Sequence, residues 1–169
     1  LKLIVGDLLP DRGSVTWEHG VTFSYLDQQL AVTQDMPVHQ YLYGVYEDLF
    51  EKERQMESLY AQSATDLDHY EALLTKATRL QEELNDAGFY ALQEKVGRLT
   101  DGLGFDSDHL EWPLARLSSG QREKAYLAKM LLEEKDVLLM DEPTNFLDQM
   151  QVAWLAKYLA DYPKAFLVV

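Results

Sequence analysis

A chain of 169 residues in which 47% of the residues are hydrophobic is long enough to fold as one domain with a sizeable core. It has no cysteine, which excludes disulfides and thiolate metal sites and is typical of a cytoplasmic protein. The formal net charge of −14 excludes a broad basic face for nucleic acid. The longest apolar runs are far shorter than the ~20 residues that cross a bilayer, so no membrane insertion is expected. The four histidines occur singly and indicate no metal site.

The first 26 residues are predicted to contain a short helix and a pair of strands. Residues 1–9 look like the end of a buried helix, and Pro10 marks the turn that follows. Residues 14–18 and 21–26 are two runs rich in β-forming residues, separated by a His-Gly pair. A β-hairpin is therefore expected after the helix.

A long helical segment is predicted from about Val38 to Leu103, because glycine and proline almost vanish there and apolar residues recur every three or four positions. Thr65, Asp66 and Asp68 are N-cap candidates between the first two apolar series. The pattern predicts a helical hairpin that leads into a third helix, and core packing or a short coiled coil accounts for its apolar stripes. Acidic residues outnumber basic ones, so contact with RNA would depend on the hairpin tip or on a few cations: Lys52, Arg54, Lys76 and Arg79.

The last third of the chain alternates helices with apolar strands. A polar link ends at Pro113 and is followed by an amphipathic helix to about Glu134, a strand at 137–140, a helix at about 149–159 and a strand from Ala165. This alternation predicts a parallel sheet, and the fold class is therefore α/β.

Two adjacent carboxylates follow the apolar run 137–140. Asp141 and Glu142 would lie at the C-terminal edge of a parallel sheet, where α/β proteins bind ligands. In phosphoryl transfer the first of two such acids can hold the Mg²⁺ shell, and the second can orient and deprotonate the attacking water. A strand that ends in acidic residues also occurs for structural reasons alone, so the surrounding residues must decide between the two interpretations.

A second polar segment lies at the start of the amphipathic helix. Ser118, Ser119, Gly120 and Gln121 offer free backbone N–H groups, two hydroxyls and the positive end of a helix, which together favour an anion such as a nucleotide γ-phosphate. Asp148 is a good N-cap for the helix that follows it. Taken alone, either segment is more often only a helix start.

Together these segments resemble the ATP-binding-cassette (ABC) family, which has a Leu-Ser-Gly-Gly-Gln signature, a helix, a Walker B strand ending in Asp-Glu and a Leu-Asp D-loop. The chain matches this order, with Ser119 in place of the usual glycine. The resemblance implies that ATP and Mg²⁺ are the cofactors, that Asp141 contacts Mg²⁺ through water and that Glu142 is the general base. It also implies that the signature segment Ser118–Gln121 contacts ATP held by an opposing cassette, and that Asp148 acts in the D-loop.

The resemblance extends upstream but leaves two motifs of the family unmatched. The segment that ends at Gln28 is similar to the Q-loop, which implies that Gln28, rather than Gln29, contacts Mg²⁺ and the attacking water. No Gly-x-x-x-x-Gly-Lys-Ser/Thr phosphate-binding loop occurs in the 169 residues, and the family's switch histidine would come just after Val169. We therefore expect a piece of a longer ATPase that is inactive by itself.

The finer pattern is similar to that of the ABC-F proteins, which are soluble tandem-cassette ATPases that act on ribosomes. Residues Asp141 to Asp148 match their Asp-Glu-Pro-Thr-Asn-His-Leu-Asp pattern, except that Phe146 replaces histidine. The helical insertion between Gln28 and the signature looks like their arm, at about residues 46–88, which reaches toward ribosome-bound tRNA.

The expected fold is a partial ABC cassette of the P-loop NTPase-like class. Residues 1–37 and 114–169 would form its parallel-sheet core, and residues 38–113 an inserted α-helical subdomain with the hairpin arm. The resemblance implies a second cassette in the same chain, the ribosome and tRNA as partners, and a role in general translation, antibiotic protection or ribosome assembly. Two alternatives stay open: the nucleotide-binding subunit of an ABC membrane transporter and, for these 169 residues alone, a non-catalytic interaction module.

Overall fold

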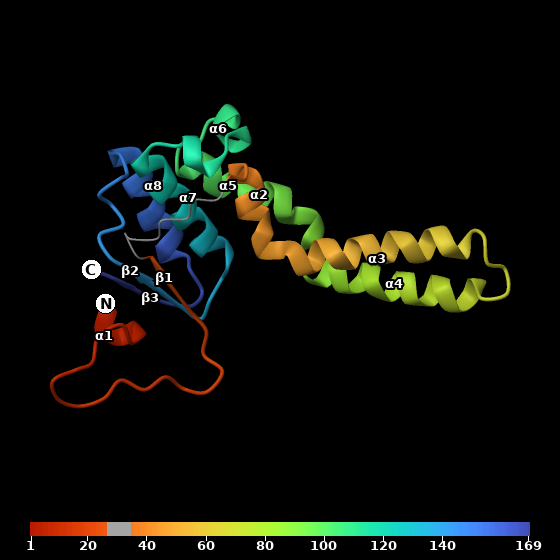
Figure 1. The fold of residues 1–169 in the computed structure, drawn as a ribbon, viewed down its shortest axis with the longest axis horizontal. Coiled ribbons are helices and arrows are strands. Elements are labelled where there is room, and N and C mark those ends of the chain that lie inside the picture. Colours follow the sequence, from red (N-terminus) through yellow and green to blue (C-terminus); the bar gives the residue numbers. More distant parts are fainter. Residues whose placement is uncertain (27–34) are drawn as a thin grey trace. The chain divides into compact units, whose positions relative to one another are not determined.

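The computed structural model describes residues 1–26 and 35–169 of the chain (Figure 1). Its residues divide into two compact units, Leu1–Leu42 with Leu99–Val169, and Tyr43–Arg98. The boundaries between the cassette core and the inserted helical subdomain, expected from the sequence after residues 37 and 113, stay a prediction.

A three-stranded parallel sheet forms the centre of the first unit. The strands β1 (Phe23–Leu26), β2 (Val137–Met140) and β3 (Ala165–Val168) lie side by side in the order β1-β2-β3 (Figure 1). The last three residues of β2 are buried, as a continuous apolar run between two parallel neighbours requires. The predicted α/β fold with a parallel sheet is therefore confirmed.

Two long helices, α7 (Ser119–Leu132) and α8 (Gln149–Ala160), belong to this unit. One stripe of α7 supplies much of the core, because Ala125, Leu127, Ala128, Leu131 and Leu132 are almost completely buried. The shorter helices of the chain outside the hairpin are α1 (Lys2–Val5), α2 (Val38–Tyr43), α5 (Leu92–Gly102), α6 (Ser107–Glu111) and the 3-10 turn η3 (Leu114–Arg116).

Close approach between α5 and α8 depends on two glycines. A Cβ atom on Gly102 would overlap the indole of Trp154, and one on Gly104 would overlap the side-chain amide of Gln151. Gly104 also has a φ of 73°, which favours glycine. Because neither glycine has a Cβ atom, the end of α5 can pack directly on the first turns of α8.

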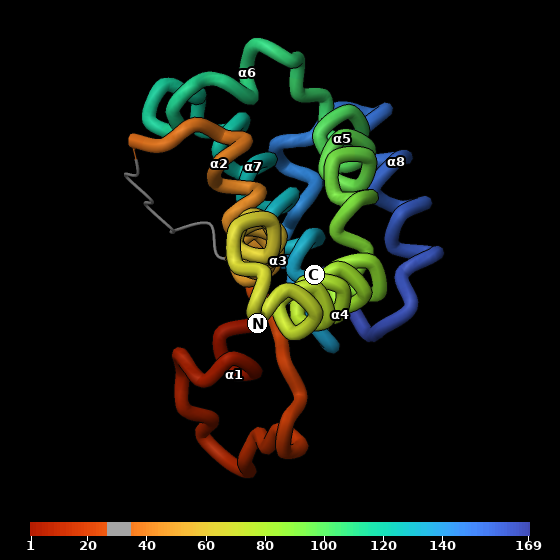
Figure 2. The backbone as a smooth tube through the Cα atoms, turned by 90° about the vertical axis from the view of Figure 1, so that its right-hand side faces the viewer, coloured from red at the N-terminus to blue at the C-terminus, as the bar shows by residue number. Residues whose placement is uncertain are grey.

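The second unit is a helical hairpin, as the apolar spacing predicts. Helix α3 (Glu47–Ser63) returns as α4 (Tyr70–Asp86), and Figure 2 shows the two helices adjacent and nearly end-on. The 3-10 turns η1 (Gly44–Tyr46) and η2 (Phe89–Ala91) flank the pair. Its hydrophobic cluster gathers at one end of the hairpin: Leu84, Phe89 and Leu92, with Tyr43, Tyr46, Leu49, Phe50 and Met56 packed around them.

Three local predictions for the N-terminal part and the hairpin tip are wrong. Residues 14–18 form no strand, and Trp17 instead stacks on Phe23 with ring centroids 4.8 Å apart. Strand β1 gains a buried partner in β2, which a two-stranded hairpin at the surface would not provide. Helix α1 forms, but none of its residues is buried. The N-cap of α4 is His69, whose backbone N–H donates to Asp66 Oδ1 at 3.1 Å, so Asp66 stabilises the turn before the helix.

No helix in the described part of the chain is both long and apolar enough to cross a membrane.

Candidate functional site: the carboxyl end of β2 and the start of α7

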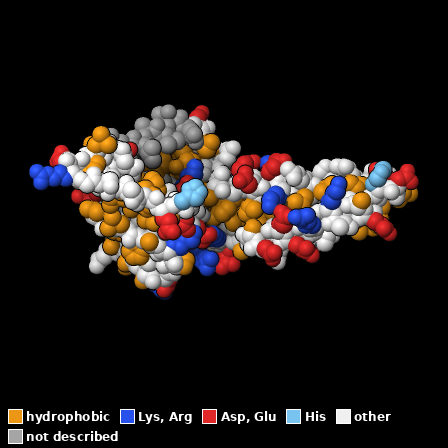
Figure 3. All heavy atoms as spheres, turned by 90° about the horizontal axis from the view of Figure 1, so that it is seen from below, with side chains coloured by type: hydrophobic (Ala, Val, Ile, Leu, Met, Phe, Trp, Pro, Cys, Tyr) orange, Lys and Arg blue, Asp and Glu red, His pale blue; other side chains and the backbone are white. Residues whose placement is uncertain are grey.

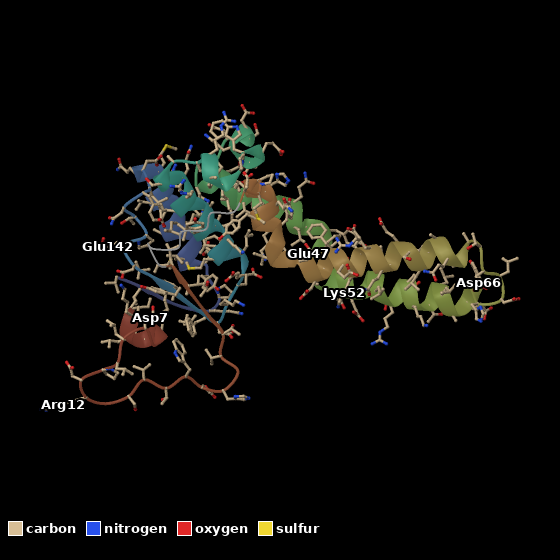
Figure 4. All side chains as sticks on the ribbon, in the orientation of Figure 1. Asp7, Arg12, Glu47, Lys52, Asp66 and Glu142 are labelled. Carbon is tan, nitrogen blue, oxygen red and sulfur yellow. The ribbon has the colours of Figure 1, made fainter. Side chains whose placement is uncertain are left out.

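The two acidic residues lie where the sequence predicts them, directly after the central strand β2. Asp141 is half-buried, and the exposed Glu142 lies beyond the end of the strand (Figure 4). The N–H group of Glu142 donates to the carbonyl of Val169 at 2.8 Å, and the Val169 N–H donates to the carbonyl of Met140 at 3.0 Å. The backbone pairing of β2 with β3 therefore continues up to the two carboxylates and fixes their position at the sheet edge.

Asn145 holds the side chain of Glu142. Its Nδ2 group donates to Glu142 Oε2 at 2.7 Å, and its backbone N–H donates to the Glu142 carbonyl at 3.2 Å. Glu142 itself has a φ of 47°, an uncommon conformation for a residue with a side chain. The turn after β2 thus presents one carboxylate oxygen of Glu142 in a fixed position, and no residue in the described part of the chain donates a hydrogen bond to the other oxygen.

The Ser-Ser-Gly-Gln segment begins helix α7 with a capping box. Ser118 Oγ accepts from the Gln121 N–H at 3.2 Å, and Gln121 Oε1 accepts from the Ser118 N–H at 2.9 Å. The N–H groups of Ser119 and Gly120 belong to the first helical turn and have no carbonyl partner within the helix. Ser118 and Ser119 are exposed, so this helix start is open to solvent.

The two motif segments lie close together. A Cβ atom on Gly120 would lie 3.8 Å from the Cβ of Phe146, in ordinary van der Waals contact. Asp148 is the N-cap of α8, as predicted, and its Oδ1 accepts from the Gln151 N–H at 2.9 Å. Gln151 Oε1 accepts in return from the Asp148 N–H at 3.1 Å. The structure therefore brings the signature segment to the loop that joins β2 and α8.

Gln28, the Q-loop candidate, and its neighbour Gln29 lie outside the described residues. Within residues 1–26 and 35–169, no group of three or more acidic or histidine side chains forms a candidate metal site. Asp141 and Glu142 are hard oxygen donors of the kind that Mg²⁺ takes through one or two carboxylates together with nucleotide phosphates. Their chemistry fits a metal that is shared with a nucleotide.

Two side chains of this region have contacts that the motif spacing does not suggest. Asn145 fits the family pattern, but its hydrogen bond to Glu142 is seen only in the structure. The spacing of three positions between the two residues is the one feature of the sequence that could have indicated this bond. His109 Nε2 lies 2.9 Å from Gln121 Nε2, and nothing in the sequence around His109 indicates this contact.

Comparison with known proteins identifies the family. The family model described as "ABC transporter" matches residues 1–145. YfmM, an ABC transporter ATP-binding protein of Bacillus subtilis, is 37% identical over 170 residues. The energy-dependent translational throttle protein EttA of Mycobacterium tuberculosis is 32% identical over 169 residues, and ABC transporter F family member 2 of Arabidopsis thaliana is 31% identical over 163 residues.

These alignments cover 100%, 100% and 94% of this chain, but only 33%, 30% and 24% of the respective relatives. A solved structure described as an inward-facing conformation of a metal-chelate type ABC transporter is similar in fold, with a TM-score of 0.50. It is 14% identical in sequence, and the match covers 99% of this chain and 55% of that chain. The chain therefore belongs to the ABC transporter family, and ABC-F proteins are among its relatives.

Proposed function

We propose that the intact protein is a cytoplasmic ABC-F type ATPase that binds and hydrolyses ATP with Mg²⁺ and acts on the ribosome. The observation that carries the ATPase part is the turn after β2, where Asn145 holds Glu142 at the edge of a parallel sheet. A carboxylate with one oxygen fixed and one oxygen free is suited to orient a water molecule and accept its proton. Asp141, one position earlier and half-buried, is suited to hold the metal shell.

The roles of the remaining site residues follow the family pattern. Mg²⁺, when bound with ATP, would neutralise charge on the phosphates, and Asp141 and Gln28 are the residues proposed to hold it. The open helix start formed by Ser118, Ser119, Gly120 and Gln121 would contact ATP on a second cassette of the same protein. Asp148 would act across the same interface from the D-loop. These 169 residues alone are proposed to be inactive, because they contain no phosphate-binding loop.

The ribosome part rests on the hairpin and on the relatives. Helices α3 and α4 lie at the sequence position of the ABC-F arm, and the relative EttA is named as a translational throttle protein. Acidic and basic side chains alternate along the hairpin (Figure 3), and three of its cations are paired with carboxylates: Lys52 with Glu83 at 2.8 Å, Arg54 with Glu47 at 2.8 Å and Arg79 with Glu83 at 3.3 Å. Contact with RNA would therefore depend mainly on the hairpin tip.

A transporter subunit is the second candidate, because YfmM is called an ABC transporter ATP-binding protein. The hairpin favours the first candidate: it adds two helices of 17 residues each to the cassette. ATP turnover stimulated by ribosomes, rather than by a membrane partner, would distinguish the two.

The ATPase proposal is tested by Glu142→Gln in the intact protein. Glutamine keeps an oxygen for Asn145 but cannot accept the proton, so turnover should fall by about 10²–10⁴-fold while ATP still binds. Turnover would be measured by phosphate release and binding by a fluorescent ATP analogue. Glu134→Gln is a matched control, since Glu134 also has a φ of 47° but lies before β2 rather than after it. Normal turnover in Glu142→Gln would exclude Glu142 as the base.

A further inference from the structure

His109 lies beside the signature segment without belonging to any motif of the sequence. Its side chain is 19% exposed, and its Nε2 lies 2.9 Å from Nε2 of Gln121. The ring packs edge-on against Trp112 with centroids 4.6 Å apart, and the guanidinium of Arg116 lies 4.0 Å from the centre of the Trp112 ring. These contacts hold the imidazole in one orientation.

The direction of the His109–Gln121 hydrogen bond follows from the capping box. Gln121 Oε1 already accepts from the Ser118 N–H, so the end of the amide that faces His109 is the NH₂ group, which can only donate. His109 Nε2 must therefore be the acceptor and carry no proton. The ring proton of neutral His109 is then on Nδ1, which is buried, makes no hydrogen bond with the described residues and lies 3.6 Å from Asp106 Oδ2.

This pairing decides which way the Gln121 amide points. If the amide turned over, its NH₂ group would face the N–H of Ser118, and two donors would oppose each other. The bond from the Ser118 N–H to the Gln121 side chain would then be lost, and only the bond from the Gln121 N–H to Ser118 Oγ would still cap the first turn of α7. Because His109 Nε2 accepts a hydrogen bond from the NH₂ group, it stabilises the observed orientation of the Gln121 amide against this rotation.

We propose that His109, as the Nδ1–H tautomer, is a positioning residue for the signature segment. It fixes the Gln121 amide, which keeps Ser118 in the cap and holds the N–H groups of Ser119 and Gly120 ready for a phosphate on the opposing cassette. The last step rests on the proposed ATPase function, whereas the fixing of the amide does not.

The structural step is tested in the full-length protein by two measurements. Selective ¹⁵N labelling of histidine should show neutral His109 with Nδ1 protonated and Nε2 unprotonated. Hydrogen exchange in the segment that contains the Ser118 amide should become roughly tenfold faster in His109→Phe, equivalent to about 1.4 kcal/mol. His109→Gln should restore slow exchange, because glutamine offers an acceptor oxygen at a similar reach. A protonated Nε2, or unchanged exchange in His109→Phe, would overturn the proposal.

The functional step is tested by ATP turnover of the same variants. His109→Phe keeps an aromatic ring against Trp112 but has no acceptor, so kcat should fall by roughly tenfold with little change in KM. His109→Gln should recover most of the loss. His19→Phe is the matched control, since His19 is exposed and lies in the segment before β1.

Three outcomes of the turnover experiment have distinct meanings. Recovery in His109→Gln but not in His109→Phe supports the proposal. Equal loss in both variants, with equally lowered Tm, means that His109 only stabilises the fold and overturns the proposal. If the natural full-length protein does not hydrolyse ATP, the proposed function fails, and the tautomer and exchange measurements still decide whether His109 fixes Gln121.

Discussion

Glu142 adopts a left-handed backbone conformation at the point where β2 ends. Such a conformation costs of order 1 kcal/mol or more for a residue with a side chain, and it persists where neighbouring contacts enforce it. Here its N–H bonds to Val169 and its carboxylate bonds to Asn145. This strained turn, with its bonds to Val169 and Asn145, supports the proposal that Glu142 is the catalytic base.

Asn145→Ala should lower kcat of the intact ATPase by roughly tenfold, with little change in KM. A hydrogen bond to a charged group contributes about 1.5–3 kcal/mol, and its loss leaves the Glu142 carboxylate free to turn away from the attacking water. Turnover at saturating ATP is the measurement. Asn85→Ala, at the end of α4, is the control for the same substitution elsewhere. If Asn145→Ala kept full turnover, the hydrogen bond would have no part in catalysis.

Asp136 connects the starts of all three strands. Its Oδ2 accepts from the N–H and the hydroxyl of Thr22 at 2.9 and 2.7 Å, and its Oδ1 lies 3.2 Å from Lys164 Nζ. The hydrogen bonds from Thr22, followed by the Lys164 cation, lower the pKa of Asp136 to about 2. The folded state therefore favours the ionised carboxylate.

This lowered pKa gives a pH-dependent stability. Because the pKa of an aspartate in an unfolded chain is ~3.9, Asp136 stabilises the fold fully above about pH 4. The contribution is lost as the pH falls towards about 2. Asp136→Asn should destabilise the protein at pH 7, and the difference from the natural protein should shrink by about half at pH 3.

Urea unfolding at several pH values measures this difference. The control is Asp11→Asn, which removes the same charge from an exposed position that contacts neither Thr22 nor Lys164. A difference that stayed constant from pH 7 to pH 3 would mean that the ionised form of Asp136 is not what stabilises the strands.

At the scale of single elements, α7 and α8 begin in the same way. Each has a capping box in which the N-cap side chain accepts from the third helical N–H and a glutamine returns the bond, with Ser118 and Gln121 in α7 and Asp148 and Gln151 in α8. Both helices follow a segment proposed to contact nucleotide. The caps therefore fix the helix starts from which the signature and the D-loop are presented.

Asp148→Ala should destabilise the protein by about 1 kcal/mol, which corresponds to a fall in Tm of about 2–4 °C for a chain of this size. The physical reason is the loss of the acceptor for the Gln151 N–H. Asp148→Ser keeps an acceptor and should retain most of the stability. Thermal unfolding of the three proteins is the measurement. Equal losses in the alanine and serine variants would show that capping is not the cause.

At the scale of the whole molecule, the hairpin forms a compact unit with a hydrophobic cluster of its own. That cluster consists mainly of aromatic and leucine side chains at one end, whereas Leu67 at the tip is 82% exposed. A hairpin stabilised at one end leaves its tip exposed to solvent. This arrangement supports the proposal that the hairpin is a recognition element.

Deleting about residues 50–86 from the intact protein should leave basal ATP turnover detectable and abolish its stimulation by ribosomes. The deletion removes most of α3 and α4 and does not touch residues 114–148, which hold the proposed catalytic motifs. Turnover with and without ribosomes, together with co-sedimentation in ATP, is the measurement. Co-sedimentation equal to that of the natural protein would exclude the hairpin as the ribosome-binding arm.

The sequence alone was sufficient for the elements whose cause is local. Strand 137–140, the helix from residue 149 and its Asp148 cap, and the hairpin helices follow from apolar spacing and capping residues within a few positions of one another. The order of the motifs along the chain was enough to identify the family.

The contacts between segments far apart in the chain follow from the three-dimensional fold and not from any local pattern. Strand β1 pairs with β2 rather than with residues 14–18, because the central strand offers it a buried partner. Thr22 donates to Asp136 across 114 positions, and the half-buried imidazole of His109 contacts Gln121. Such pairs depend on which surfaces the fold buries against each other, and no local pattern encodes that choice. The signature pattern was therefore recognisable in the sequence, whereas the contact between His109 and Gln121 was not.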